Sequence, residues 1–324
     1  TSAAYLAAGL QAERVEIWTD VPGMFSANPR QVGSARLLRR LGYEEAQEIA
    51  TTGARVLHPR CIEPVRRHGI PLHIKCTTEP SLDGTVIGAD QAEGGARVKA
   101  ISARTGLTLV SMESLGMWQQ VGFLADVFGT FKRHGLSIDL VATSESNVTV
   151  SLDSGTNGLD RAALQALVAD LSEHCTARII GPCAAISLVG RDIRSILHRL
   201  APALEVFEEQ RVYLLTQAAS DLNVTFVMDE EGAEGLVKKL HALLFGETQP
   251  DAVFGPSWRE LQEPAAAERK LHERWWRQRA QELVRVADEA GGPVYVYDEE
   301  TLDASVAQVK GLPVDRAFYA VKAN

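Results

Sequence analysis

The sequence has few cysteines, no long apolar run and no excess of basic residues, and each shortage excludes a class of protein. The four cysteines, Cys61, Cys76, Cys175 and Cys183, form no CxxC pair and do not lie near histidines at zinc-ligand spacing. We therefore expect reduced thiols of a cytosolic protein, and no structural metal site. No apolar segment approaches the roughly 20 residues that cross a bilayer. The formal net charge of −9 disfavours nucleic-acid and membrane-surface binding.

Both ends of the sequence look interrupted. Ala3–Ala8 reads as the middle of a helix without an N-cap before it, and Arg316–Asn324 reads as a strand without a partner. The start also lacks the basic segment and apolar core of a signal peptide. We expect a cytoplasmic fragment, and its 324 residues suffice for two or three domains.

Strands and helices alternate in the first 95 residues, which predicts a layered α/β domain. Gly84 and Gly88–Gly95 read as the linker that ends it. The expected helices are Ala3–Gln11, Tyr43–Ala50 and Ala54–His68, and the expected strands are Arg14–Asp20 and Ile70–Ile74.

A repeat follows this linker. Residues 146–153 (SNVTVSLD) and 222–229 (LNVTFVMD) match almost residue for residue. Each copy belongs to a strand–helix–strand–strand–helix unit of the ferredoxin-like pattern. The second unit has no final strand of its own, so we expect the two units to share strands or to pack as one body. The first unit is expected to comprise 107–113, 122–134, 138–144, 147–153, 161–174 and 176–180, and the second 185–190, 193–207, 211–217, 223–229 and 232–245.

Asp20 closes an expected strand, where ligands bind in open α/β sheets, although an Asp at this place more often forms a turn. The surrounding segment VEIWTDVPGMFSANPR (15–30) resembles the nucleotide-binding segment of aspartate kinases. So do TGARVLHP (52–59), RHGIPL (67–72) and GTVI (84–87). The resemblance extends to about residue 245 and implies the C-terminal part of an amino-acid-kinase fold. It also implies ATP with Mg²⁺ and L-aspartate as substrates, and ATP contacts at Thr19, Asp20, Phe25, Arg30, Arg55 and Val56.

The sequence departs from this family at several points. Phe25 stands where the family has Tyr, and Arg55 stands where it has Lys, which changes the geometry of the cation. The KFGGTS and RGGSD segments, which bind aspartate and cradle the phosphates in the family, do not occur. We therefore expect the chain alone to lack kinase activity.

The repeated units resemble ACT domains, which sense small molecules and often pair across a dimer. SLGMWQQVGFLADVF (114–128) and LSIDLVATSE (136–145) are similar to the effector site of lysine-sensitive aspartate kinases. Two carboxylates on one strand, Asp139 and Glu145, suit the two ammonium groups of lysine. The resemblance implies L-lysine as the allosteric effector, a homodimer, and effector contacts at Met117, Gln120, Phe123, Leu124, Ser137, Ile138, Asp139, Ser144 and Glu145.

The C-terminal segments PVYVYD (293–298) and RAFYAVKAN (316–324) resemble the opening of diaminopimelate decarboxylase, a β/α barrel. That resemblance implies that Lys322 is the catalytic lysine that forms a Schiff base with pyridoxal phosphate. The expected elements here are a linker at 246–264, a helix at 265–290, strands at 293–297 and 317–321, and a helix at 300–310.

Three interpretations follow. The first is an aspartate kinase fused to diaminopimelate decarboxylase, with a lysine sensor between them. The second is an ACT-type regulatory module without catalysis, and the segment before Gly84 argues against it. The third is a threonine-sensing kinase, whose usual homoserine dehydrogenase partner should bring a GxGxxG fingerprint that we do not find. The first interpretation divides the chain into a kinase segment at 1–95, ACT domains at 105–182 and 183–246, a linker and helix at 247–290, and a decarboxylase start at 291–324.

Overall fold

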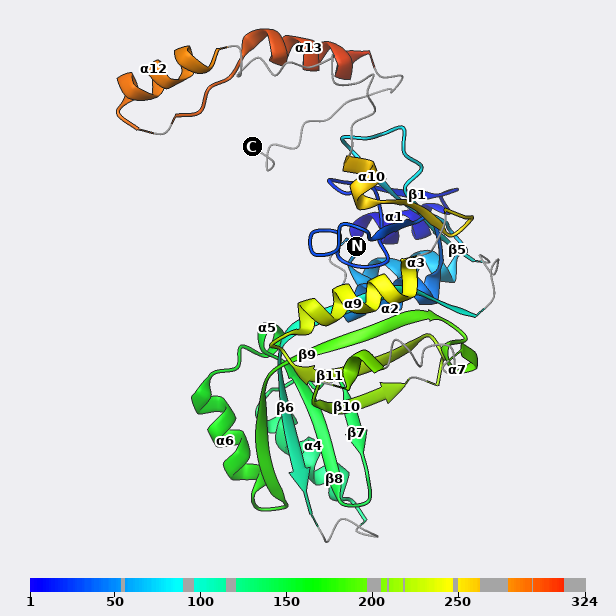
Figure 1. The fold of residues 1–324 in the computed structure, drawn as a ribbon, viewed down its shortest axis with the longest axis vertical. Coiled ribbons are helices and arrows are strands. Elements are labelled where there is room, and N and C mark those ends of the chain that lie inside the picture. Colours follow the sequence, from blue (N-terminus) through cyan, green and yellow to red (C-terminus); the bar gives the residue numbers. More distant parts are fainter. Residues whose placement is uncertain are drawn as a thin grey trace. The chain divides into compact units, whose positions relative to one another are not determined.

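The computed structural model describes residues 1–53, 56–89, 96–114, 121–196, 205–208, 210–217, 219–246, 250–262, 279–292 and 294–311. The chain divides into two compact units, Thr1–Gln262 and Glu263–Asn324 (Figure 1). Among the helices in the described ranges, none is long and apolar enough to cross a membrane.

The N-terminal region, residues 1–89, contains a four-stranded sheet. The predicted strand after the first helix forms β1, and the next predicted strand forms β4, parallel to it. Two strands that we did not expect, β3 and β5, complete the sheet, in the order β1-β4-β5-β3. The bounds are β1 (Val15–Thr19), β3 (Arg40–Gly42), β4 (Leu72–Cys76) and β5 (Thr85–Gly88).

Three α-helices belong to this region: α1 (Ser2–Leu10), α2 (Tyr43–Thr52) and α3 (Ile62–Arg67). The first two match the prediction. The long helix expected over 54–68 is wrong in its described residues, because 56–58 are not helical and a 3₁₀ turn at Pro59–Cys61 precedes α3. Proline lacks the N–H that a continuing helix needs, so the helical segment starts afresh there.

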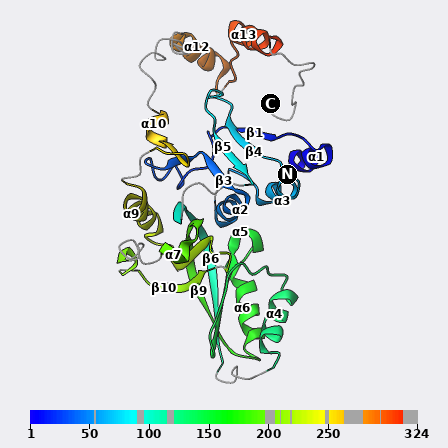
Figure 2. The same cartoon turned by 90° about the vertical axis from the view of Figure 1, so that its right-hand side faces the viewer.

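Beyond the N-terminal region lies a six-stranded sheet, in the order β10-β11-β9-β6-β8-β7. Two long strands form its centre, β6 (Arg97–Glu113) and β9 (Thr176–Arg191), which pair antiparallel along most of their length. Helix α2 lies between the two sheets (Figure 2). The outer strands are β7 (Val141–Thr143), β8 (Asn147–Asp153), β10 (Val212–Gln217) and β11 (Asn223–Asp229).

The two ferredoxin-like units share the long strands. The first unit uses the second half of β6 and the first half of β9, with helices α4 (Phe123–Arg133) and α6 (Arg161–Leu171). The second unit uses the second half of β9 and helix α9 (Ala233–Phe245), and its missing strand is the first half of β6. We expected the two units to share strands, but we did not expect the first half of β6 to complete the second unit. The edge that the missing strand would leave open is therefore already covered within the chain.

The units differ in how they are buried. The first unit has its own core under α4 and α6, formed by residues such as Phe131, Val150 and Leu167. Among its described residues, the second unit has no separate core on its α9 side. Leu188, Phe226 and Leu240 belong to the same buried cluster as Leu38 and Ile74 of the N-terminal region. Apolar burial is the main stabilising term in folding, so the second unit and the N-terminal region stabilise each other.

The segment predicted as a linker after residue 246 is partly structured. Strand β12 (Phe254–Ser257) pairs antiparallel with β2 (Arg36–Leu38) of the N-terminal region, and α10 (Trp258–Gln262) follows it. The second compact unit contains α12 (Ala280–Ala290) and α13 (Glu299–Lys310). The strand expected at 293–297 is wrong for its described residues, 294–297, which have no regular structure. The last expected strand, at 317–321, lies outside the described residues.

Candidate nucleotide and effector sites

Thr19 and Asp20 lie where the sequence placed them, at the carboxyl end of β1. The Thr19 hydroxyl donates to Oδ1 of Asp20 over 3.0 Å. The Thr19 carbonyl accepts the N–H of Thr77 at 2.9 Å, so the chain after the parallel strand β4 holds this end of β1 in place. The carboxylate of Asp20 is exposed, and it is free to meet a polar ligand beyond the strand ends.

The loop at residues 24–38 contains candidate ATP contacts and is called the nucleotide loop below; it follows the end of β1 and returns as β2. Its base is closed by two backbone hydrogen bonds of 2.8 Å, from Leu38 N–H to the Met24 carbonyl and from Ser26 N–H to the Arg36 carbonyl. At its tip the side chain of Asn28 accepts the N–H of Arg30 at 3.1 Å. Arg30 is exposed there, so its guanidinium is available to an anionic ligand.

Phe25 does not offer an aromatic face to a nucleotide in this structure. Phe25 is only 6% exposed, and its ring packs edge-on against the ring of Trp258, with the ring centroids 5.5 Å apart. The sequence could not indicate this, because Trp258 lies in the segment that we read as a linker. Of the remaining candidates, Val56 is half-buried and Arg55 lies outside the described residues.

The nucleotide loop has a buried partner that the sequence analysis did not single out. His241 of α9 is 1% exposed, and its Nε2 lies 2.8 Å from the hydroxyl of Ser26. Its Nδ1 lies 3.3 Å from the hydroxyl of Ser34. Burial first, and then the nearby Arg36 guanidinium, lower the pKa of His241 from its ordinary 6.5 to about 4. The imidazole is therefore neutral at physiological pH.

A second buried polar contact joins α2 to the six-stranded sheet. Nζ of Lys99, on β6, lies 2.7 Å from both carboxylate oxygens of Glu45, with hydrogen-bond geometry toward Oε2. The same Oε2 accepts the N–H of Gly42 at 2.8 Å. The side chains of Glu45 and Lys99 are 0% and 4% exposed. Desolvation lowers the pKa of Lys99, and the Glu45 carboxylate partly opposes that shift.

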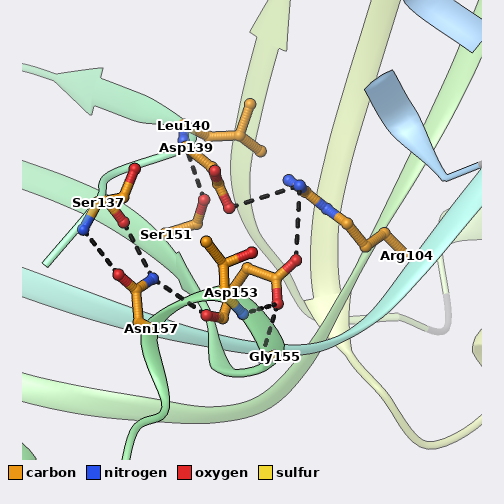
Figure 3. A network of polar contacts seen from close by, with 9 residues as sticks. Arg104, Ser137, Asp139, Leu140, Ser151, Asp153, Gly155 and Asn157 are labelled. Atoms are coloured by element: carbon orange, nitrogen blue, oxygen red, sulfur yellow. Dashed lines mark hydrogen bonds and ion pairs between the residues drawn. The ribbon is translucent and has the colours of Figure 1, made fainter. Parts of the chain in front are cut away.

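The effector candidate Asp139 is engaged with another residue of the chain (Figure 3). Its Oδ2 lies 3.4 Å from Nη1 of Arg104, which also lies 3.8 Å from Oδ2 of Asp153. Burial raises the pKa of Asp139, Arg104 opposes this, and the Asp153 carboxylate adds to it. Arg104 was not predicted, since it precedes the expected strand and lies 35 positions from Asp139 in the sequence.

The segment that carries Asp139 is held by its neighbours. Asn157 accepts the N–H of Ser137 at 2.7 Å and donates to its carbonyl at 3.1 Å (Figure 3). The hydroxyl of Ser151 accepts the N–H of Leu140 at 3.0 Å. Only Val141–Thr143 of the expected strand is formed, so Asp139 precedes the strand and Glu145 follows it. The two carboxylates therefore flank β7 and do not alternate along it.

The other effector candidates fall into three groups. Ser144 and Glu145 are exposed in the turn after β7, and Leu124 is 41% exposed on α4. Phe123 is buried in the core of the first unit, and Ile138 packs against that core. Met117 and Gln120 lie outside the described residues, as does the decarboxylase candidate Lys322. Within the described ranges, no cluster of three His, Cys, Asp or Glu side chains could hold a metal ion.

Comparison with known proteins agrees with this arrangement. Residues 1–76 match the model of the amino acid kinase family. The chain is 36% identical over 246 residues to the lysine-sensitive aspartokinase 3 of Escherichia coli, covering 75% of this chain and 55% of that protein. The chain is similar to aspartokinases over this region. It spans about half the length of the curated relatives that it matches first.

Two solved structures of E. coli aspartokinase III have the same fold over this region. The complex with aspartate and ADP, called the R-state, superposes with a TM-score of 0.68, and the complex with lysine and aspartate, called the T-state, with 0.64. Each match has 36% identity and covers 75% of this chain; they cover 55% and 54% of the solved chains. The family model match at residues 1–76 includes the nucleotide loop. None of these matches concerns a decarboxylase.

Proposed function

We propose that this chain is the C-terminal catalytic and regulatory part of an aspartate kinase, which transfers a phosphoryl group from ATP to the side-chain carboxylate of L-aspartate. The observation that carries the proposal is the 36% identity to a lysine-sensitive aspartokinase, extending over 246 residues. The geometry supports it. Exposed Asp20 and Arg30 emerge from one strand end and its loop, and phosphoryl transfer depends mainly on positioning and charge. ATP, with its Mg²⁺, is a substrate in this proposal.

Arg30 should contribute to nucleotide affinity. In the longest protein encoded by the gene, Arg30→Ala should weaken ADP binding about 10- to 100-fold, because a charge-assisted hydrogen bond contributes roughly 1.5–3 kcal/mol. Isothermal titration with ADP and Mg²⁺ measures this. Arg67→Ala is the matched control, since Arg67 is an exposed cation of α3 paired with Glu63. Equal losses of ADP affinity in both variants would mean that only the net charge of the protein affects ADP binding.

The 324-residue chain alone should release no ADP when it is given ATP and aspartate, and release of ADP would contradict that expectation.

We further propose that L-lysine is the effector and binds at the first ferredoxin-like unit as an ACT-type sensor, with Asp139 and Glu145 toward its ammonium groups. The lysine complex of the E. coli relative supports this choice of ligand. Asp139 already faces a cation, Arg104, at 3.4 Å. An ammonium group of lysine would therefore meet a carboxylate that is placed for a positive partner.

Lysine should raise the melting temperature of the chain, by an amount equivalent to RT ln(1 + [L]/Kd), and threonine should not. Asp139→Ala should weaken lysine binding by about 1–3 kcal/mol, since it removes one charge-assisted bond. Asp126→Ala, an exposed residue of α4, is the control for the lost charge. Scanning calorimetry with each amino acid measures both effects. A larger shift with threonine would point to the threonine-sensing interpretation.

Two finer assignments complete the proposal. A homodimer through the ACT-like units would cover an end strand of the six-stranded sheet, and light scattering at micromolar concentration tests it, with a clean monomer as the contrary result. Fusion to diaminopimelate decarboxylase, with Lys322 as the pyridoxal phosphate lysine, rests on the resemblance of residues 316–324. Sequencing the gene beyond Asn324 tests it, because the proposal requires the remainder of a β/α barrel there.

A further inference from the structure

Helix α9 of the second ferredoxin-like unit reaches the nucleotide loop through one side chain. His241 contacts two hydroxyls of that loop, those of Ser26 and Ser34. Residue Ser26 follows Phe25 directly and lies four positions before Arg30. The contact therefore joins the second ferredoxin-like unit to the segment that the aspartokinase resemblance assigns to ATP.

The hydroxyl of Ser26 has two roles in this contact. It accepts the N–H of Arg36 at 2.8 Å, across the base of the nucleotide loop. With that lone pair occupied, its proton is available to Nε2 of a neutral His241, while the Nδ1–H is available to Ser34. One neutral tautomer thus satisfies both ring nitrogens of His241 and the hydroxyl of Ser26.

The ring of His241 is fixed from its other side. It lies against Phe245, with centroids 4.8 Å apart, and Phe245 packs edge-on against Phe254 of β12 at 5.6 Å. Strand β12 pairs with β2, the returning strand of the nucleotide loop. The position of the imidazole is therefore set by α9 and β12, and the loop is bonded to that position.

We propose that His241 is a positioning residue of the nucleotide loop, through which α9 of the second ferredoxin-like unit fixes Ser26 and the neighbouring ATP-binding residues. The role of the loop in ATP binding rests on the proposed function, but the bond itself does not. A change in the second unit that shifts α9 is transmitted to the loop by this contact.

The carboxylates and several of the cations on the elements around this contact are engaged with other partners. On the nucleotide loop, the positive charge of Arg36 helps to lower the pKa of His241. The Arg36 guanidinium also donates to the Gly255 carbonyl at 3.1 Å. On β6, Arg97 is paired with Asp251 at 2.9 Å. On α10, Glu260 accepts hydrogen bonds from Ser257. On α9 itself, Glu234 and Lys238 form an exposed pair. Each of these carboxylates is bonded away from the imidazole, so none of them compensates a proton added to His241.

The test compares three variants by hydrogen exchange of the backbone amides of residues 24–38. His241→Ala should lower the protection of the Ser26 and Arg36 amides at least 10-fold. His241→Gln, whose amide can reach the Ser26 hydroxyl, should restore most of it. Leu236→Ala is the control, because it removes buried volume from the same helix without touching the polar chain. If His241→Ala and Leu236→Ala lower protection equally, or Gln does not rescue, the proposal is overturned.

A second readout separates this proposal from the proposed function. In the longest encoded protein, His241→Ala should raise the KM for ATP at least 10-fold with a smaller change in kcat, and Gln should reverse it. Loss of loop protection in a protein that binds no nucleotide would leave the positioning role intact and defeat the aspartate kinase assignment. Unchanged loop protection in an active kinase would defeat the positioning role alone.

Discussion

Replacing Lys99 by methionine should lower the free energy of unfolding of the chain by about 3–5 kcal/mol, because it leaves the carboxylate of Glu45 buried without its countercharge. That carboxylate is fully buried, and Lys99 is its nearest cation, at 2.7 Å. The other one, Arg191, lies 3.9 Å from Oε1. The N–H of Gly42 stabilises only Oε2. Urea unfolding of wild type and variant measures the difference.

Two controls separate this effect from the general cost of losing a lysine. Lys238→Met removes a cation from an exposed pair with Glu234 at the same 2.7 Å distance, and should cost under about 1 kcal/mol. The double variant Lys99→Met/Glu45→Gln should recover much of the loss, since no charge then remains unpaired. If Lys99→Met costs no more than Lys238→Met, the buried pair contributes little to stability.

The position of this pair gives the result a wider meaning. Glu45 lies on α2 of the N-terminal region, and Lys99 lies in the half of β6 that completes the second ferredoxin-like unit. Around the pair, the region and the unit share one hydrophobic core. Loss of the pair should therefore destabilise both together. Because they share this core, the N-terminal region and the second unit should unfold cooperatively, in a single transition.

The elements with strong periodicity were predictable from the sequence. Strands β8 and β11 begin and end as predicted, since each is a buried run, rich in apolar and β-branched residues, between an Asn and a closing Asp. The short strands β2, β3 and β12 were not found, because three or four residues carry too little pattern to be recognised. Strand β9 was read as two strands, 176–180 and 185–190, because each was assigned to a different unit of the repeat. The structure has one continuous strand over both ranges.

The candidate sites divide in the same way. The place of Thr19 and Asp20 at the end of β1 was predictable, because a strand end is a local feature of the sequence. His241 was not, since a single histidine in an apolar helix gives no signal of a partner 215 positions away. The burial of Phe25 was hidden for the same reason. Whether a side chain such as that of Phe25 is buried depends on contacts with residues distant in the sequence, and the sequence alone does not show those contacts.

Acidification from pH 7 to 4 should destabilise the wild-type chain by about 3 kcal/mol more than it destabilises His241→Gln. The unfolded state binds a proton at His241 near pH 6.5, whereas the folded state does so only near 4. The depressed pKa means that the unfolded state takes up this proton first. Stability from the neutral, bonded imidazole is thus fully present above pH 6.5 and falls as the pH drops toward 4.

The comparison uses the difference between wild type and variant because other groups also titrate in this window. Burial raises the pKa of Asp251, but hydrogen bonds from backbone N–H groups and Arg97 outweigh it and leave that pKa lowered, so its contribution is lost at acidic pH in both proteins. The pKa of Glu260 is lowered by its hydrogen bonds to Ser257, also in both. Only the His241 contribution disappears with the substitution. Urea unfolding at pH 7, 6, 5 and 4 gives the two slopes, and parallel slopes would show that His241 is protonated in the folded chain as readily as in the unfolded one.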